Sequence, residues 1–229
     1  MPATVTGISS MATRGVLAEL GAAWRERSGV TLAIEATGGV DAARRVAAGE
    51  AFDVVVLASD AIDKLVAGGH LAAGSRVDLV RSPVAIAVRA GAPRPDVSSE
   101  AAVRDAVRGA RTVGFSTGPS GVFLQQLFER WGLAAELEGR LVQAKPGVPV
   151  GRLVAEGQCE LGFQQLSELM HEPGVDVLGL LPPEIAHVTV FSAALPVRGA
   201  QADAVRGWIA FATSADADEA KRRHGMEPA

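Results

Sequence analysis

The chain has 229 residues, of which 48% are hydrophobic and 21% are charged, so it can bury a full-sized core and lies outside the disordered class. Its net charge of -4, with arginines spread along the sequence, leaves no basic face for a phosphate backbone, so we expect no nucleic-acid partner. The single cysteine, Cys159, excludes an intrachain disulfide, and the four scattered histidines give no zinc-ligand spacing, so neither a metal nor a cofactor is expected.

No segment has the pattern of a membrane span or of a secretory signal. The longest uncharged stretch near the C-terminus, residues 185–197, is too short to cross a bilayer, so no membrane insertion is expected. Residues 1–7 lack the basic start and the apolar run of a signal segment. We therefore expect a cytoplasmic protein, or a periplasmic one if a signal segment has been removed.

Short apolar runs alternate with longer stretches of helical period, a pattern typical of an α/β protein with a mainly parallel sheet. The first half of the chain is expected to contain three strands, each leading into a helix. The strands are predicted at residues 5–8, 31–36 and 53–58. The first two helices have apolar positions within residues 16–24 and 42–47, and the third is predicted at residues 61–67.

Small or hydroxyl-bearing residues follow each of these strands, where we expect them to cap the helices. They are Ser9 and Ser10, then Thr37, Gly38 and Gly39, then Ser59 and Asp60. Glycines at positions 29 and 49 are predicted to end the first two helices.

A strand at residues 84–88, beginning after Pro83, and a stiff turn at residues 91–95 predict the start of a second unit. Further strands are expected at residues 112–115, 160–163, 175–181 and 188–195. Helices are expected at residues 99–107, 122–131, 148–156, 167–171, 202–213 and 215–223. The segment from Ser116 to Gly121, which includes Ser120, is predicted to be a glycine-containing loop before a helix.

Four junctions of this kind indicate a site for a small anion. Two are in the first half of the chain, after Ser9 and after Thr37, and two are in the second half, at residues 116–121 and 145–149. Helix N-termini offer unpaired N–H groups and a partial positive charge, so several of them together can hold an anion without lysine or arginine. The plain alternative for each junction is an ordinary N-cap or turn.

In order along the chain, these residues resemble the periplasmic molybdate-binding proteins of ABC transporters. The resemblance rests on Ser9-Ser10, the run at residues 53–60 with Lys64 and Leu65, residues 162–165, and the ending at residues 223–226, and it covers nearly the whole chain. It implies the type II periplasmic binding fold, in which two α/β lobes are joined by two crossovers with a ligand cleft between them. Lobe 1 would comprise residues 1–81 and 191–229, and lobe 2 residues 82–190.

The resemblance also implies binding positions for a small anionic ligand, a molybdate-like oxyanion or a di- or tricarboxylate. An ABC transporter would be a partner only if a signal peptide has been removed. The positions implied by the resemblance are Ser10, Gly39, Ser120, Gly147 or Val148, and Gln165. The junction residues Ser9, Thr37, Gly38 and Ser116 are further candidates for ligand binding, from their place at helix starts. Two of the implied positions depart from the family's pattern. Gly39 stands in place of a serine, and Gln165 stands in place of a tyrosine in a chain that contains no tyrosine.

The same broad family includes aconitate isomerases, which implies an alternative function. A larger carboxylate ligand suits the space left by Gly39 and Gln165, and Arg14 could form a fork to a carboxylate. Moving a double bond by a 1,3-proton shift requires a base and an acid. Glu168, Asp41 and Lys145 are candidates for the base, and the sequence assigns none of them. Cys159 has no histidine nearby in the sequence, so a buried structural thiol is expected there.

Overall fold

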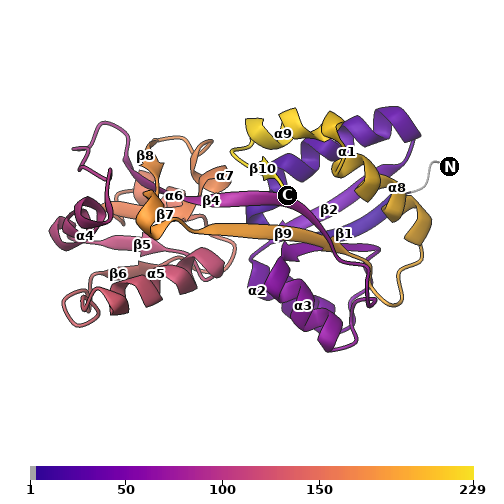
Figure 1. Cartoon of the computed structure of the whole chain (residues 1–229), viewed down its shortest axis with the longest axis horizontal. Coiled ribbons are helices and arrows are strands. Elements are labelled where there is room, and N and C mark those ends of the chain that lie inside the picture. The colour runs from indigo at the N-terminus through magenta and orange to yellow at the C-terminus, as the bar shows by residue number, and fades with distance from the viewer. Residues whose placement is uncertain (1–3) are drawn as a thin grey trace. The chain divides into compact units, whose positions relative to one another are not determined.

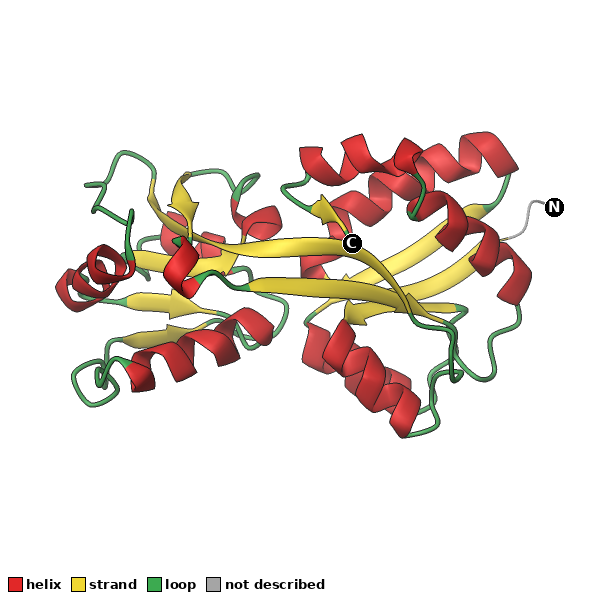
Figure 2. Ribbon diagram, viewed as in Figure 1, coloured by secondary structure: helices red, strands yellow, loops and turns green. Residues whose placement is uncertain are grey.

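The computed structural model describes residues 4–229, which fall into two compact units (Figure 1). Unit 1 comprises the chain up to Ser82 together with Val190–Ala229, and unit 2 comprises Pro83–Thr189. The chain passes from unit 1 to unit 2 within one strand and returns within another. Both units contain helices and strands, so the expected α/β class is confirmed (Figure 2).

Unit 1 is a mixed sheet covered by helices on both faces. Its strands are β1 (Thr4–Ser10), β2 (Thr31–Thr37), β3 (Val54–Ala58), the first part of β4 (Val77–Arg89), most of β9 (Val188–Ala194), and β10 (Glu227–Pro228). Its helices are α1 (Arg14–Ser28), α2 (Gly39–Ala47), α3 (Ser59–Ala67), α8 (Ala202–Ala212) and α9 (Asp218–Arg223), with 3-10 turns at Met11–Thr13 and Ala215–Ala217. β1 is parallel to β2 and β3, whereas β9 is antiparallel to β3.

Alternation along β3 explains the two helical layers of unit 1. Val54 and Val56 pack into the cluster that includes residues of α1 and α8, and Val55 and Leu57 pack into the cluster that includes residues of α2 and α3. All five residues of β3 are buried, as the uninterrupted apolar run predicts for a central strand. Burial of both faces of β3, together with the buried residues of β1, fixes the register of these strands.

Unit 2 has the same layered plan. Its strands are the second part of β4, β5 (Val113–Phe115), β6 (Leu141–Gln143), β7 (Leu161–Gln165) and β8 (Val175–Leu180). Its helices are α4 (Glu100–Gly109), α5 (Pro119–Arg130), α6 (Val150–Ala155) and α7 (Leu166–Leu169), with a 3-10 turn at Pro183–Ile185. β5 is parallel to β6 and β7, and β4 is antiparallel to β7 and β8.

The largest difference from the expected elements concerns β4, which begins at Val77 and runs through Pro83 instead of starting at residue 84. A proline lacks an N–H and normally interrupts a strand in the middle of a sheet. Here β10 pairs with β4 at Val80 and Arg81, and β7 begins to pair at Val84, so Pro83 falls between these two ladders. The sequence contains no local signal for this arrangement.

Several predicted helix starts are also displaced. α5 begins at Pro119 instead of residue 122, since proline fits the first helical position, and Ser120 and Gly121 therefore lie in its first turn. Ser59 and Asp60 are the first residues of α3 rather than its caps, and Ser10 precedes a 3-10 turn without a capping side-chain bond. The helix ending at Gly29 is confirmed, with Gly29 in the left-handed region at φ 72°.

Candidate functional site

The carboxyl ends of β1 and β2 lie side by side in unit 1 and bring the first two predicted loops together. Ser10 is paired with Thr37 in the parallel register. A Cβ added at Gly39 would lie 3.8 Å from Ser10 Oγ, so only the missing side chain separates this hydroxyl from the start of α2. Ser9 is buried, and its hydroxyl donates to the Glu35 carbonyl at 3.4 Å. Of the two serines, Ser10 has the hydroxyl that is available to a ligand.

The start of α2 offers backbone donors beside this hydroxyl. Gly38 is the N-cap residue and makes no side-chain capping bond. The first N–H groups of a helix have no partner within the helix, so those of α2 can receive an anion. The Thr37 hydroxyl donates to Asp41 at 3.2 Å, which removes it from the set of free donors.

Arg14 supplies a positive charge one turn beyond Ser10. It is the first residue of α1 and is exposed, and across residues 4–229 its guanidinium makes neither an ion pair nor a hydrogen bond. The turn between the two residues is held by the Thr13 hydroxyl, which donates to the Ser10 carbonyl at 3.0 Å. A free guanidinium beside hydroxyl and amide donors favours a carboxylate or another oxyanion.

Asp41 is poorly suited to act as a base. A hydrogen bond from Arg44 and a second from Thr37 hold the pKa of this carboxyl below its usual range. A lowered pKa makes the carboxylate a weaker proton acceptor. Asp41 therefore serves to anchor Thr37 and Arg44 at the first turn of α2.

In the corresponding loop of unit 2, at residues 116–121, the serine hydroxyls are hydrogen-bonded within the loop and the first turn of α5. Ser116 Oγ and Ser120 Oγ are 3.0 Å apart and hydrogen-bonded, and Ser116 Oγ also accepts from the Gly118 N–H at 3.2 Å. A Cβ added at Gly121 would collide with the Ser116 carbonyl oxygen, so the loop and α5 approach each other as closely as glycine permits. Ser120 is only 2% exposed.

Gln165 ends β7 and is 3% exposed. Its Nε2 donates to Thr189 Oγ1 at 2.8 Å, across 24 residues of sequence. The preceding residue points to the other face of the strand: Gln164 Oε1 accepts from the Val150 N–H at 2.7 Å, and its Nε2 donates to Glu168 Oε1 at 2.7 Å. The structure therefore gives both glutamines structural partners.

The fourth predicted loop leaves few free donors. Gly147 adopts a left-handed conformation at φ 79°, and the Val148 N–H donates to the Lys145 carbonyl at 2.9 Å. The N–H groups that start α6 are occupied by the Gln164 side chain. The exposed Lys145 is the charged group nearest in sequence to Gly147.

Two residues that the sequence analysis did not select lie close to these groups. Thr189 contacts Gln165, as described above, and the His187 ring stacks on Phe123 with centroids 4.3 Å apart and an interplanar angle of 16°. Burial lowers the pKa of His187, which favours the neutral imidazole. The only sequence signal for these residues is their place at the start of the apolar run that becomes β9.

Cys159 is 1% exposed, and burial raises the pKa of its thiol to about 11. A thiol of this kind is a poor nucleophile. Among residues 4–229, no group of three or more histidine, cysteine, aspartate or glutamate side chains is arranged to hold a metal ion. No helix in that same stretch is both long and apolar enough to cross a bilayer.

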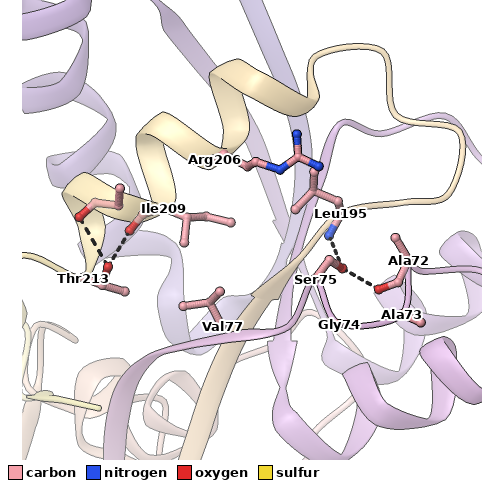
Figure 3. Close-up of a pocket in the computed structure, with 10 residues that line it drawn as sticks. Ala72, Ala73, Gly74, Ser75, Val77, Leu195, Arg206, Ile209 and Thr213 are labelled. Carbon is pink, nitrogen blue, oxygen red and sulfur yellow. Dashed lines mark hydrogen bonds between the residues drawn. The ribbon is translucent and has the colours of Figure 1, made fainter.

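A pocket of about 440 Å³ opens in unit 1 (Figure 3). It lies at the end of the sheet opposite to the carboxyl ends of β1 and β2. It is lined by residues before β4, after β9 and on α8, including Ser75, Leu195 and Arg206. β9 pairs its last residue, Ala194, with Val55 near the start of β3, whereas the predicted loops follow the ends of β1 and β2. The Ser75 hydroxyl already donates to the Ala72 carbonyl and accepts from the Leu195 N–H. The pocket is therefore separate from the predicted anion site.

The chain is similar to proteins of known family. The profile of a family described as bacterial extracellular solute-binding protein matches residues 5–227. An aconitate isomerase from Pseudomonas sp. is 38% identical over 231 residues, covering 98% of this chain and 88% of that protein.

Solved structures share the fold at lower identity. The periplasmic molybdate-binding protein of Azotobacter vinelandii superposes with a TM-score of 0.81 at 18% identity, covering 97% of this chain and 98% of that one. The tungstate ABC transporter protein of Geobacter sulfurreducens superposes with a TM-score of 0.74 at 16% identity, covering 95% and 97%. These likenesses confirm the periplasmic-binding-protein-like fold that the resemblance implied.

Proposed function

The chain belongs to the family of bacterial extracellular solute-binding proteins, and from this premise we propose that it binds a small organic anion, a di- or tricarboxylate. The observation that carries the proposal is the exposed Arg14 guanidinium, without an ion pair among residues 4–229, one turn from the Ser10 hydroxyl. A guanidinium matches the two oxygens of a carboxylate in a bidentate pair.

The two departures from the molybdate-binding pattern support a carboxylate over a tetrahedral oxyanion. Gly39 retains a backbone N–H but has no hydroxyl, and Gln165 is a buried amide bonded to Thr189. Two hydroxyl donors of the family's pattern are therefore absent. The space beside Ser10 that Gly39 leaves open suits a ligand larger than an oxyanion.

We assign the ligand-binding role to groups of both units. In unit 1 they are Ser10, Arg14 and the first N–H groups of α2, with Ser9 and Thr37 holding the loops. In unit 2 the proposed positions are Ser116, Ser120, Gly147, Val148 and Gln165. Since most of the unit 2 donors already have partners, ligand contact there would exchange or share existing hydrogen bonds.

A second candidate function is isomerisation of aconitate, favoured by the 38% identity to an aconitate isomerase along nearly the whole chain. In such a reaction a base removes a proton from the methylene carbon next to the double bond. The freed electron pair forms the new double bond, the old one opens, and a proton is added to its far carbon, so that atoms and charge balance. Among the three candidate bases, Glu168 is hydrogen-bonded to Gln164 and Asp41 has a lowered pKa.

Thermal unfolding of the purified chain tests the ligand class. The chain is scanned with molybdate, tungstate, sulfate, citrate, cis-aconitate and trans-aconitate, each near millimolar concentration. A ligand at 100 times its dissociation constant stabilises the folded state by about 2.7 kcal/mol, which raises the melting temperature by roughly 5 to 11 °C. We expect shifts with the carboxylates. Shifts confined to molybdate and tungstate would overturn the proposed ligand class.

Proton NMR in D2O tests the isomerase. With catalytic amounts of protein, trans-aconitate should convert to cis-aconitate, and its methylene protons should exchange with deuterium. Binding without conversion or exchange would identify the chain as a solute-binding protein alone.

The compartment also separates the two functions. The family is described as extracellular, which supports a periplasmic site of action and a transporter partner. Osmotic-shock fractionation of cells that express the full natural gene, probed with an antibody to the chain, would assign it. Recovery with the cytoplasmic fraction would favour the isomerase.

A further inference from the structure

His187 is linked to two proposed binding positions of unit 2, Ser120 and Gln165, through one intermediate residue each. Its ring stacks on Phe123, which follows Ser120 by three residues and so lies on the same side of α5. It precedes Thr189 by two residues, and Thr189 accepts the hydrogen bond from Gln165. The Val84 N–H donates to the His187 carbonyl at 3.0 Å and ties its backbone to β4.

The two ring nitrogens of His187 have different surroundings. Nε2 is buried and has no hydrogen-bond partner among the described residues, whereas Nδ1 is not among the buried atoms without a partner. An enclosed N–H without an acceptor is costly, and orphaned N–H groups are the rarest kind of buried polar group. The single proton of the neutral ring therefore belongs on Nδ1, which makes no hydrogen bond within residues 4–229.

We infer that the Nδ1–H of His187 donates a hydrogen bond to a carboxylate of the ligand, and that His187 is a specificity-determining residue of the proposed site. The inference rests on the proposed carboxylate-binding function. It adds an uncharged donor to unit 2 that the molybdate-like positions do not include. Burial keeps the ring neutral, so the donor is present without a second positive charge.

The position of His187 also limits the size of the ligand. Residues two apart along an extended chain are separated by roughly 7 Å. His187 stands two residues before Thr189, which accepts the hydrogen bond from Gln165. A ligand that contacts both His187 and the Gln165 end needs acceptors several ångströms apart. The carboxylates of a tricarboxylate meet this requirement, and the oxygens around one tetrahedral centre do not.

Three substitutions of His187 test the donor at atomic level. His187→Asn keeps an N–H close to the Nδ1 position, His187→Gln moves it toward the Nε2 position, and His187→Phe keeps an aromatic ring against Phe123 without any donor. His70→Asn, in a loop of unit 1, is the matched control. Each full-length variant is titrated calorimetrically with trans-aconitate and with molybdate, after its unfolding curve is compared with that of the unaltered chain.

We expect His187→Phe and His187→Gln to weaken trans-aconitate binding by roughly 10- to 100-fold, the effect of losing a hydrogen bond to a charged group. His187→Asn and His70→Asn should stay within about threefold of the unaltered chain. Should His187→Phe not fold, the comparison of Asn with Gln carries the same information.

Unchanged affinity in His187→Phe, or equal losses in His187→Asn and His187→Gln, would overturn the role of His187 and leave the proposed function intact. If the unaltered chain binds molybdate and not trans-aconitate, both the ligand class and this inference are wrong. If it binds neither, the proposed function fails as well.

Discussion

Unit 1 and unit 2 both place hydroxyl residues and glycines at the carboxyl ends of parallel strands, but they use the hydroxyls differently. In unit 1 the Ser10 hydroxyl makes no hydrogen bond within the described chain, and no side chain caps the start of α2. In unit 2 the hydroxyls of Ser116 and Ser120 bond to each other, and the Gln164 side chain occupies the start of α6. The same residue types thus give donors without hydrogen-bond partners among the described residues in unit 1, called the open loop, and donors with partners in unit 2, called the closed loop.

Under the proposed function, this difference predicts which unit contributes more to the free energy of ligand binding. Donors without partners gain a hydrogen bond when a ligand arrives, whereas donors with partners only exchange one bond for another. Unit 1, which also carries the free Arg14, should therefore supply most of the binding free energy. Unit 2 should contribute shape and selectivity through Gln165 and His187. Four measurements test this difference between the units.

The largest expected effect comes from paired glycine substitutions at the helix starts of the two units. Gly121→Ala should destabilise the protein by roughly 3 kcal/mol, because the new Cβ collides with the Ser116 carbonyl and either the loop or α5 must move. Gly39→Ala should change stability by less than about 1 kcal/mol, because the nearest atom, Ser10 Oγ, is 3.8 Å away. Urea unfolding measures both, and equal losses would contradict the contrast between a closed and an open loop.

Arg14→Ala should weaken trans-aconitate binding by about 30-fold, or about 2 kcal/mol, because it removes a charge-assisted bidentate bond. Arg14→Lys should recover part of this loss through its charge alone. Arg27→Ala serves as a control, since Arg27 lies at the far end of the same helix and pairs with Asp216. Isothermal calorimetry compares the three variants, and a similar loss in Arg27→Ala would point to a general charge effect.

Gln164→Leu tests whether the closed start of α6 is structural. The change leaves the buried Val150 N–H and the Glu168 carboxylate without this partner, which should cost about 1.5 kcal/mol. Gln158→Leu is the matched control, because Gln158 is exposed and its side-chain amide donates to the exposed Glu156 carboxylate. Equal stability of the two variants in urea would show that the Gln164 contacts contribute nothing.

The smallest expected effect is a dependence of stability on pH from His187. Burial lowers the pKa of the folded-state imidazole below its ordinary value of 6.5. As pH falls through 6.5 the unfolded chain takes up a proton before the folded chain does, so stability decreases with falling pH until the folded pKa is reached. The loss should be small, because this ring is only half-buried and solvent screens its charge. His187→Asn should remove that part of the pH dependence, and an identical profile in the variant would show that His187 does not titrate differently on folding.

Sequence periodicity predicted the strongly patterned elements well and the irregular ones poorly. The apolar run at residues 53–58 became the buried β3, and Gly29 ended α1 as expected. β6 and β10 were not expected, because each is short and includes an exposed residue, whereas the equally short β5 is fully buried and was expected at residues 112–115. The predicted start of β4 was wrong because proline was taken to interrupt the strand, whereas β4 runs through Pro83.

The residue types of the candidate site could be predicted from the sequence, but not which of its hydroxyls already have hydrogen-bond partners in the fold. Hydroxyl and glycine residues at strand ends predicted Ser10, Gly39, Ser116 and Ser120 as possible anion donors. Nothing in the sequence distinguished the free Ser10 from the paired Ser116 and Ser120, because a short i to i+4 contact depends on where the helix starts. His187 was missed since its neighbour Phe123 is 64 residues away in the chain (187 − 123).

The α/β class, the small residues at the helix starts and the resemblance to anion-binding proteins could be recognised from the sequence, since each depends on local spacing and residue type. The folded structure was needed to show which donors already have hydrogen-bond partners, that Gln165 bonds to Thr189, and that His187 stacks on Phe123. These contacts join residues far apart in sequence. They depend on the sheet registers and helix packing that burial of the hydrophobic clusters fixes in each unit.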